Sequence, residues 1–102
     1  MSYYLVAQLN FKDEAWWPEY LKGNSPLIEK HGGKVLARTR QFDKLSPGED
    51  KPSVIVLIEW PTKEAAQAFA TDPDYAPYEK LRVEGSTGTA FMVLGEDEAN
   101  TL

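Results

Sequence analysis

A chain of 102 residues, 42% of them hydrophobic and 26% charged, has the size and composition of one soluble globular domain. Its formal net charge of −5 provides no basic surface for phosphates, which excludes nucleic acid as an expected partner. Cysteine is absent and His31 is the single histidine, so we expect no metal and no cofactor, although an all-oxygen cation site stays open.

The first predicted element is a strand over residues 2–10, in which side chains alternate between two faces. The chain enters this strand without the basic segment of a signal peptide, and no apolar run approaches the roughly 18 residues of a membrane span. We therefore expect a cytoplasmic protein with no membrane partner.

A helix follows, with one stripe of side chains that recur at three- and four-residue spacing. The stripe consists of Trp17, Tyr20, Leu21, Asn24, Leu27, Ile28 and His31. Asp13 is expected to be the N-cap or a first-turn acid, and Gly32 and Gly33 are expected to end the helix by offering a left-handed cap. Pro26 lacks the backbone N–H for a bond to the preceding turn, so we expect the helix to kink or split there.

Two strands separated by a polar loop come next. The second strand is predicted over residues 33–42, the loop over 43–52, and the third strand over 54–60, with the sequence VIVLIEW. Because the side chains of a strand alternate between faces, this strand has apolar residues on both sides. They are Val54, Val56, Ile58 and Trp60 on one side and Ile55 and Leu57 on the other.

The last third of the chain contains further helical segments and a fourth strand. Thr62 is expected to cap one helix and Asp72 to cap a second, which Gly85 closes. The fourth strand is predicted over residues 87–95. The acidic tail over residues 97–102 is expected to be frayed.

The order of these elements predicts an α+β fold of the ferredoxin-like type, βαββαβ, in a single domain over residues 1–96. Its four-stranded antiparallel sheet carries both helices on one face. Ile55, Leu57 and one of the two alternating apolar pairs of the fourth strand then stay uncovered. A large exposed apolar patch usually marks an interface, so we predict a homodimer in which two sheets face each other.

Five segments together resemble a known family. They are YYLVAQLN, KHGGKVLAR, VIVLIEWPTKEAAQAF, DPDYAPYEKLR and GSTGTAFMV. In these segments the chain is similar to a bacterial family of domains of unknown function, numbered thirteen-thirty, within the dimeric α+β barrel superfamily. The resemblance implies a ferredoxin-like subunit that pairs through its sheet. Relatives in the superfamily include cofactor-free monooxygenases, muconolactone-type isomerases and haem enzymes, but the family brings no activity of its own.

Three ionisable residues are candidates for chemistry. His31 suits a general base, or it interacts as a helix-terminal histidine with the negative end of the helix dipole. Glu59 suits an acid or base shielded on the sheet face without helices, or it forms an interface salt bridge or a solvated rim charge. Arg38, in the middle of the second strand, either clamps a ligand anion or pairs with Glu59 across the sheet.

Aromatic and polar residues of the helices and the third strand are candidates for a ligand site. Tyr20, Trp60, Tyr75 and Arg82, together with Trp17, have the composition of a small-molecule pocket with a cationic end. Aromatic residues at helical spacing are also typical of an ordinary core. Asn24, the polar residue within the first helical stripe, either caps a broken helix at Pro26 or lines the same cavity.

Two functions from different classes follow from these residues. The first is a dimeric module that binds a small aromatic or anionic metabolite. The alternative is a cofactor-independent enzyme, isomerase or monooxygenase-like, in which His31 or Glu59 moves a proton while Arg38 holds an anion. Convergence of these three residues on one cavity would favour the enzyme, and their separation would favour the binding module.

Overall fold

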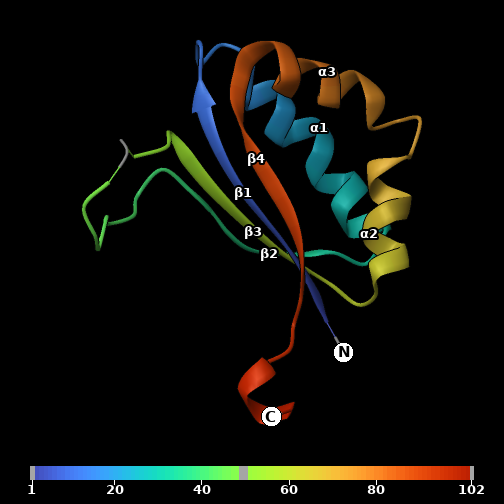
Figure 1. Cartoon of the computed structure of the whole chain (residues 1–102). Helices are drawn as coiled ribbons and strands as arrows, with labels where there is room; N and C mark the ends of the chain where they lie inside the picture. Colours follow the sequence, from blue (N-terminus) through green and yellow to red (C-terminus); the bar gives the residue numbers. More distant parts are fainter. Residues whose placement is uncertain (1, 49–50, 102) are drawn as a thin grey trace.

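A four-stranded sheet with helices on one face forms the frame of the protein (Figure 1). The computed structural model describes residues 2–48 and 51–101. Its elements in chain order are β1 (Tyr3–Phe11), α1 (Trp17–Lys30), β2 (Lys34–Thr39), β3 (Val54–Trp60), α2 (Lys63–Ala70), α3 (Ala76–Gly85), β4 (Ser86–Leu94) and a short 3-10 helix, η1 (Glu98–Thr101). None of the helices in these ranges is long and apolar enough to cross a membrane.

The strand order is β2-β3-β1-β4 and every neighbouring pair is antiparallel, which confirms the predicted ferredoxin-like fold. Tyr3 of β1 lies opposite Trp60 of β3 on one side and Leu94 of β4 on the other. Side chains of the three strands therefore line up in rows across the sheet. The even-numbered residues of β3, from Val54 to Trp60, are all buried on the helix side, as predicted.

Helix α1 runs without interruption through Pro26, so of the predicted kink or split, the split was wrong. Proline removes one backbone hydrogen bond, but burial of Tyr20, Asn24 and Ile28 against the rest of the protein stabilises the helix on both sides of it. Asp13 is not the N-cap, because its carboxylate accepts a hydrogen bond from the backbone N–H of Ala15 in the turn before the helix.

The later helices begin at different kinds of residue. Thr62 caps α2 as predicted, since its hydroxyl accepts a hydrogen bond from the backbone N–H of Ala65 at 3.1 Å. Asp72 does not cap α3, which begins at Ala76 after an additional turn. The Asp72 carboxylate accepts instead from the backbone N–H of Asp74 within that turn.

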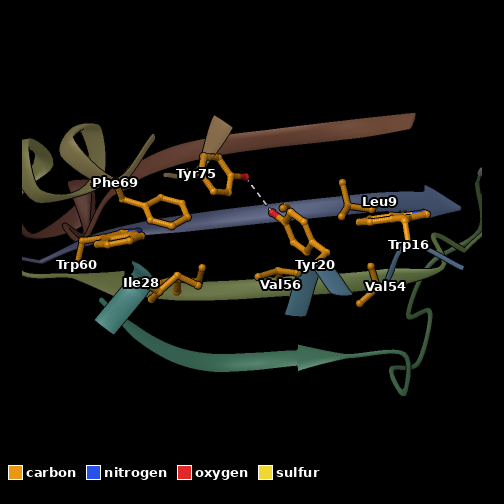
Figure 2. Packing of buried hydrophobic residues seen from close by; sticks show 12 residues of the cluster. Leu9, Trp16, Tyr20, Ile28, Val54, Val56, Trp60, Phe69 and Tyr75 are labelled. Atoms are coloured by element: carbon orange, nitrogen blue, oxygen red, sulfur yellow. Dashed lines mark hydrogen bonds between the residues drawn. The ribbon is translucent and has the colours of Figure 1, made fainter. Parts of the chain in front are cut away.

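Large aromatic side chains hold the helices on the sheet (Figure 2). At one end of the core, Trp16 lies edge-on to Tyr20 with ring centroids 5.3 Å apart. At the other end, the rings of Trp60 and Phe69 are 5.2 Å apart, and Phe69 also packs on Tyr75 at 4.4 Å. The helix layer therefore rests on aromatic contacts at both ends, with the middle of the sheet between them.

The face of the sheet opposite the helices is open, and β4 has large exposed side chains. Phe91 is 60% exposed and Val93 is 42% exposed. The polar loop between β2 and β3 borders a hollow together with Gln8 and Ile55, both of which point away from the helices. The loop thus lies on the open side of the sheet, and it extends away from the helices in Figure 1.

Gly85, the last residue of α3, lies against the buried indole of Trp16. The Nε1–H of Trp16 donates to the carbonyl oxygen of Gly85 at 3.0 Å. A Cβ atom at Gly85 would approach the Cδ1 and Nε1 atoms of Trp16 to 2.3 Å. The direct passage from α3 into β4 at Ser86 therefore requires a residue without a side chain at position 85.

Gly85→Ala should lower the free energy of unfolding by about 1–3 kcal/mol, because overpacking against Trp16 outweighs the roughly 1 kcal/mol by which alanine usually favours a helix. Denaturant unfolding measures this difference. The control Lys80→Ala, on the exposed side of the same helix, should stay within about 0.5 kcal/mol of the wild type. A Gly85→Ala protein more stable than the wild type would contradict the close contact.

Candidate functional site

A cavity of about 200 Å³ lies between the sheet and the helices. Its apolar lining consists of Leu5, Ala7, Leu9, Ile28, Val56, Ile58, Phe69, Ala70 and Ala90. Its polar lining consists of Tyr20, Asn24, Arg38, Tyr75, Glu79 and Arg82. Of the residues that the sequence suggested for ligand contact, Trp17 and Trp60 do not line the cavity. Those that line it are Tyr20, Asn24, Arg38, Tyr75 and Arg82.

Small side chains on the sheet leave room for the cavity. Ala7 of β1 lies directly opposite Ala90 of β4 and Val56 of β3. The side chains in the middle of the sheet are therefore small and extend only a short way toward the helices. The aromatic residues at the two ends of the core keep the helices from closing onto it. The space follows from this difference in size between the residues at the ends of the core and those in its middle.

The hydroxyl groups of two tyrosines form a hydrogen bond above these small side chains. Tyr20 comes from α1 and Tyr75 from the turn before α3, and their oxygen atoms are 2.9 Å apart (Figure 2). Both side chains are buried. Burial raises the pKa of Tyr20, with a further rise from Tyr75, while Arg82 and a hydrogen bond from Asn24 act in the opposite direction. Tyr20 therefore keeps its proton at neutral pH.

Arg38 reaches the cavity because β2 contains a bulge. The register to β3 shifts between Val35, opposite Ile58, and Ala37, opposite Leu57. A bulge adds one residue to a strand and so reverses the faces of those that follow. Arg38 consequently lies opposite Val56, on the helix side. In a regular strand it would have pointed to the open face.

The guanidinium of Arg38 is partly buried and incompletely bonded. Its Nη1 atom is buried and has no hydrogen-bond partner among the residues that the structure describes. Burial lowers the pKa of Arg38, but a guanidinium stays charged at neutral pH. A partly buried cation without a partner for this atom destabilises the protein, which makes Nη1 the first candidate for ligand contact.

Asn24 also lines the cavity, and so it does not cap a broken helix. Its side chain is 4% exposed, and its Oδ1 atom finds no partner in residues 2–48 and 51–101. Buried amide oxygens are normally hydrogen-bonded, and leaving one unpaired costs about 1–3 kcal/mol. This oxygen is thus the second unsatisfied atom of the cavity.

Arg82 and Glu79 complete the polar lining from α3. Burial acts to lower the pKa of Arg82, but the hydroxyls of Tyr75 and Tyr20 together with Glu79 outweigh this effect and the pKa is raised. Sequence reasoning missed Glu79. It lies four residues after Tyr75 and three before Arg82, so the helical spacing already used for those two residues would have found it.

His31 lies outside the cavity, at the end of α1. Its Nε2 atom is 2.8 Å from the Oδ2 atom of Asp72, which also accepts from the Nζ atom of Lys30 at 3.0 Å. These two contacts tie the end of α1 to the turn before α3. The histidine thus joins two helical segments at a distance from the tyrosine pair.

Glu59 lies on the open face of the sheet, opposite Tyr4 and Lys34. Its carboxylate accepts a hydrogen bond from the hydroxyl of Tyr4 at 3.2 Å, which raises the pKa of that tyrosine. The expected pairing of Glu59 with Arg38 was wrong, because the bulge places the two side chains on opposite faces.

Trp60 is fully buried in the core beside Phe69. Its indole Nε1–H has no partner in the described part of the chain. It supports the end wall of the core and does not line the cavity. In the same described ranges, no three His, Cys, Asp or Glu side chains group so as to hold a metal ion.

Asp72→Asn should lower the melting temperature at pH 7, because it removes the carboxylate that His31 and Lys30 contact. The hydrogen bond from His31, with those from the Asp74 backbone and Lys30, holds the pKa of Asp72 below its unfolded value of about 3.9. Its ionised form therefore stabilises the folded state above about pH 4 and ceases to do so as the pH falls through the lowered pKa. Thermal unfolding should show the difference from wild type shrinking between about pH 4 and pH 2. A difference that stays constant down to pH 2 would contradict this role.

Solved structures share this fold at low sequence identity. The protein of unknown function RPA0582 from Rhodopseudomonas palustris is 17% identical, with a TM-score of 0.72, and the match covers 93% of this chain and 84% of that chain. SnoaB, a cofactor-independent oxygenase from Streptomyces nogalater, is 14% identical, with a TM-score of 0.68 and 94% of each chain covered. A dimeric ferredoxin-like protein of unknown function from Jannaschia sp. CCS1 is 13% identical, with a TM-score of 0.56, and the match covers 89% of this chain and 98% of that chain.

Sequence comparison places the chain in a family. No curated protein sequence matches it. Residues 2–96, which contain every element from β1 to β4, match the family model described as a domain of unknown function (DUF1330). The resemblance of the five segments is thereby confirmed. The chain belongs to the DUF1330 family.

Proposed function

We propose that the cavity binds a small organic anion, with the acid group on Arg38 and an apolar or aromatic body against the walls. The observation that carries this proposal is the buried Nη1 atom of Arg38, which has no partner in the part of the chain that the structure describes. A ligand carboxylate would supply the missing acceptor and the missing counter-charge together.

The charges of the lining support an anion over a cation. The cavity holds two guanidinium groups, on Arg38 and Arg82, and one carboxylate, on Glu79. The net charge of the lining side chains is therefore positive, although the whole chain has a net charge of −5. Solvent and salt screen the negative charges of the rest of the surface from a ligand in the cavity more strongly than the charges that line it.

The size and walls of the cavity restrict the ligand further. A volume of about 200 Å³ lies below the range typical of pockets for drug-sized molecules. A single ring or a short chain that carries an acid group is therefore the expected size. Phe69, Tyr20 and Tyr75 present ring surfaces that suit an apolar or aromatic body.

The enzyme alternative receives less support from the geometry. SnoaB, a cofactor-independent oxygenase, has the same fold, which keeps catalysis open as a second class. However, neither His31 nor Glu59 lines the cavity that Arg38 enters. A proton shuttle through either residue has no geometric path to a ligand held there, so we favour the binding module.

We also propose that two copies pair through the open sheet face. On this face Phe91 and Val93 of the edge strand β4 are 60% and 42% exposed. Large apolar side chains exposed on a sheet face usually mark an interface. A similar fold occurs as a dimer in the Jannaschia protein, which supports the same arrangement here.

Arg38→Met should abolish ligand binding without weakening the fold. Methionine keeps the apolar stem but removes a charge that has an unsatisfied atom, so the free protein should be as stable as the wild type or more stable. If the wild type binds benzoate or butanoate, the affinity of Arg38→Met for the same acid should be lower by about 30-fold or more. Isothermal calorimetry measures the affinity, and thermal unfolding measures the stability of the free protein.

The matched control for this variant is Arg40→Met, two residues further along the chain. Arg40 is exposed and forms an ion pair with Glu14 outside the cavity. Its loss should leave ligand affinity unchanged. Equal affinity in wild type and Arg38→Met, or a large loss of stability in Arg38→Met, would instead make Arg38 a structural residue.

The dimer proposal predicts a mass of twice 11.5 kDa in solution. Phe91→Glu should convert this dimer into a monomer, because it places a charge from each copy in an apolar interface. Light scattering with size-exclusion chromatography measures the mass. Val83→Glu, at a position of α3 that is 58% exposed and lies away from the open sheet face, is the control and should remain dimeric. A wild-type monomer at micromolar concentration would refute the pairing.

A further inference from the structure

The two unsatisfied atoms of the cavity have opposite hydrogen-bonding character. The Nη1 atom of Arg38 can only donate, and the Oδ1 atom of Asn24 can only accept. Both residues line the same cavity of about 200 Å³. One ligand within it would have to offer an acceptor to the first atom and a donor to the second.

The remaining polar groups do not satisfy the Asn24 oxygen. Tyr20 and Tyr75 form a hydrogen bond with each other at 2.9 Å. Neither hydroxyl is a hydrogen-bond partner of the Asn24 Oδ1 atom, which has none in the described part of the chain. A donor group on a ligand would supply the missing hydrogen bond.

We infer that the ligand is a hydroxy acid, whose carboxylate lies on Arg38 and whose hydroxyl donates to the Oδ1 atom of Asn24. This inference rests on the anion site proposed above. A simple acid would leave this buried oxygen unpaired. A second anionic group beside it would face an amide oxygen with no donor of its own. A hydroxyl group supplies the missing proton at the smallest volume.

The local charge favours a hydroxyl over an amine. An aliphatic amino group would donate equally well, but it would be cationic at neutral pH. Arg38 and Arg82 already place two positive charges on the cavity against the one negative charge of Glu79. A third cation would be repelled by this positive excess. The donor is therefore neutral.

Matched ligand pairs test the inference in the wild-type protein. The probes are benzoate, its three hydroxy isomers and their methoxy counterparts, with butanoate and its 2-, 3- and 4-hydroxy derivatives as a parallel set. At least one hydroxy acid should bind about tenfold more tightly than its parent acid, the effect expected from one added hydrogen bond to a buried acceptor. The methoxy counterparts should lose this gain, because they cannot donate.

A variant of Asn24 tests whether this residue causes the tighter binding of the hydroxy acids. Asn24→Leu removes the acceptor at similar volume, and in this variant the hydroxy acids should bind no more tightly than their parent acids. Arg38→Met should lose both classes of ligand. Because the comparison of ligands in the wild type needs no variant, the test stands even if Asn24→Leu does not fold.

The outcomes separate this inference from the proposal on which it rests. Equal binding of every hydroxy acid and its parent by the wild type would overturn the hydroxy-acid assignment and leave the anion site intact. Equal gains from hydroxy and methoxy groups would also overturn it, since they would show that no donor is required. If no acid of either set binds, the anion site itself fails.

Discussion

The hydrogen bond between the hydroxyls of Tyr20 and Tyr75 is the contact on which the site depends. It joins α1 to the turn before α3 directly above the sheet, where Ala7 and Ala90 are too small to fill the space. The aromatic rings at both ends of the core hold the helices at the height that this contact needs. The cavity is consequently a product of packing between large and small residues, and its polar rim is fixed in place by buried groups.

Stability and binding place opposite demands on the residues around this contact. A protein selected only for stability would pair or replace the Nη1 atom of Arg38 and the Oδ1 atom of Asn24, because each unsatisfied group destabilises the fold. Both residues nevertheless line one cavity. Unpaired polar groups that collect at a single place are typical of functional sites, where local strain is tolerated for the sake of a ligand.

The two faces of the sheet are suited to different tasks. The helix side encloses the cavity, and the open side, with β4, presents the apolar surface that we assign to a second copy. The bulge in β2 separates these tasks, since it turns Arg38 toward the cavity and leaves Ala37 and Thr39 on the open side. Glu59 belongs to the open side as well, where Tyr4 donates to it. A ligand and a partner subunit would thus bind to separate surfaces of one small domain.

The amino-acid sequence by itself determined the order of the elements, the buried face of β3 and the inward stripe of α1, because alternation and helical periodicity are local properties of the chain. It also identified most of the polar residues that line the cavity as candidates for a ligand site. Only the tertiary structure decided that Arg38 faces the helices, since the bulge depends on how β2 pairs with β3. The pairing of His31 with Asp72, which are 41 residues apart, and the passage of α1 through Pro26 likewise depend on contacts between distant segments. Periodicity describes which face a side chain occupies along a regular element, but register, bulges and partners arise only when separate elements pack together.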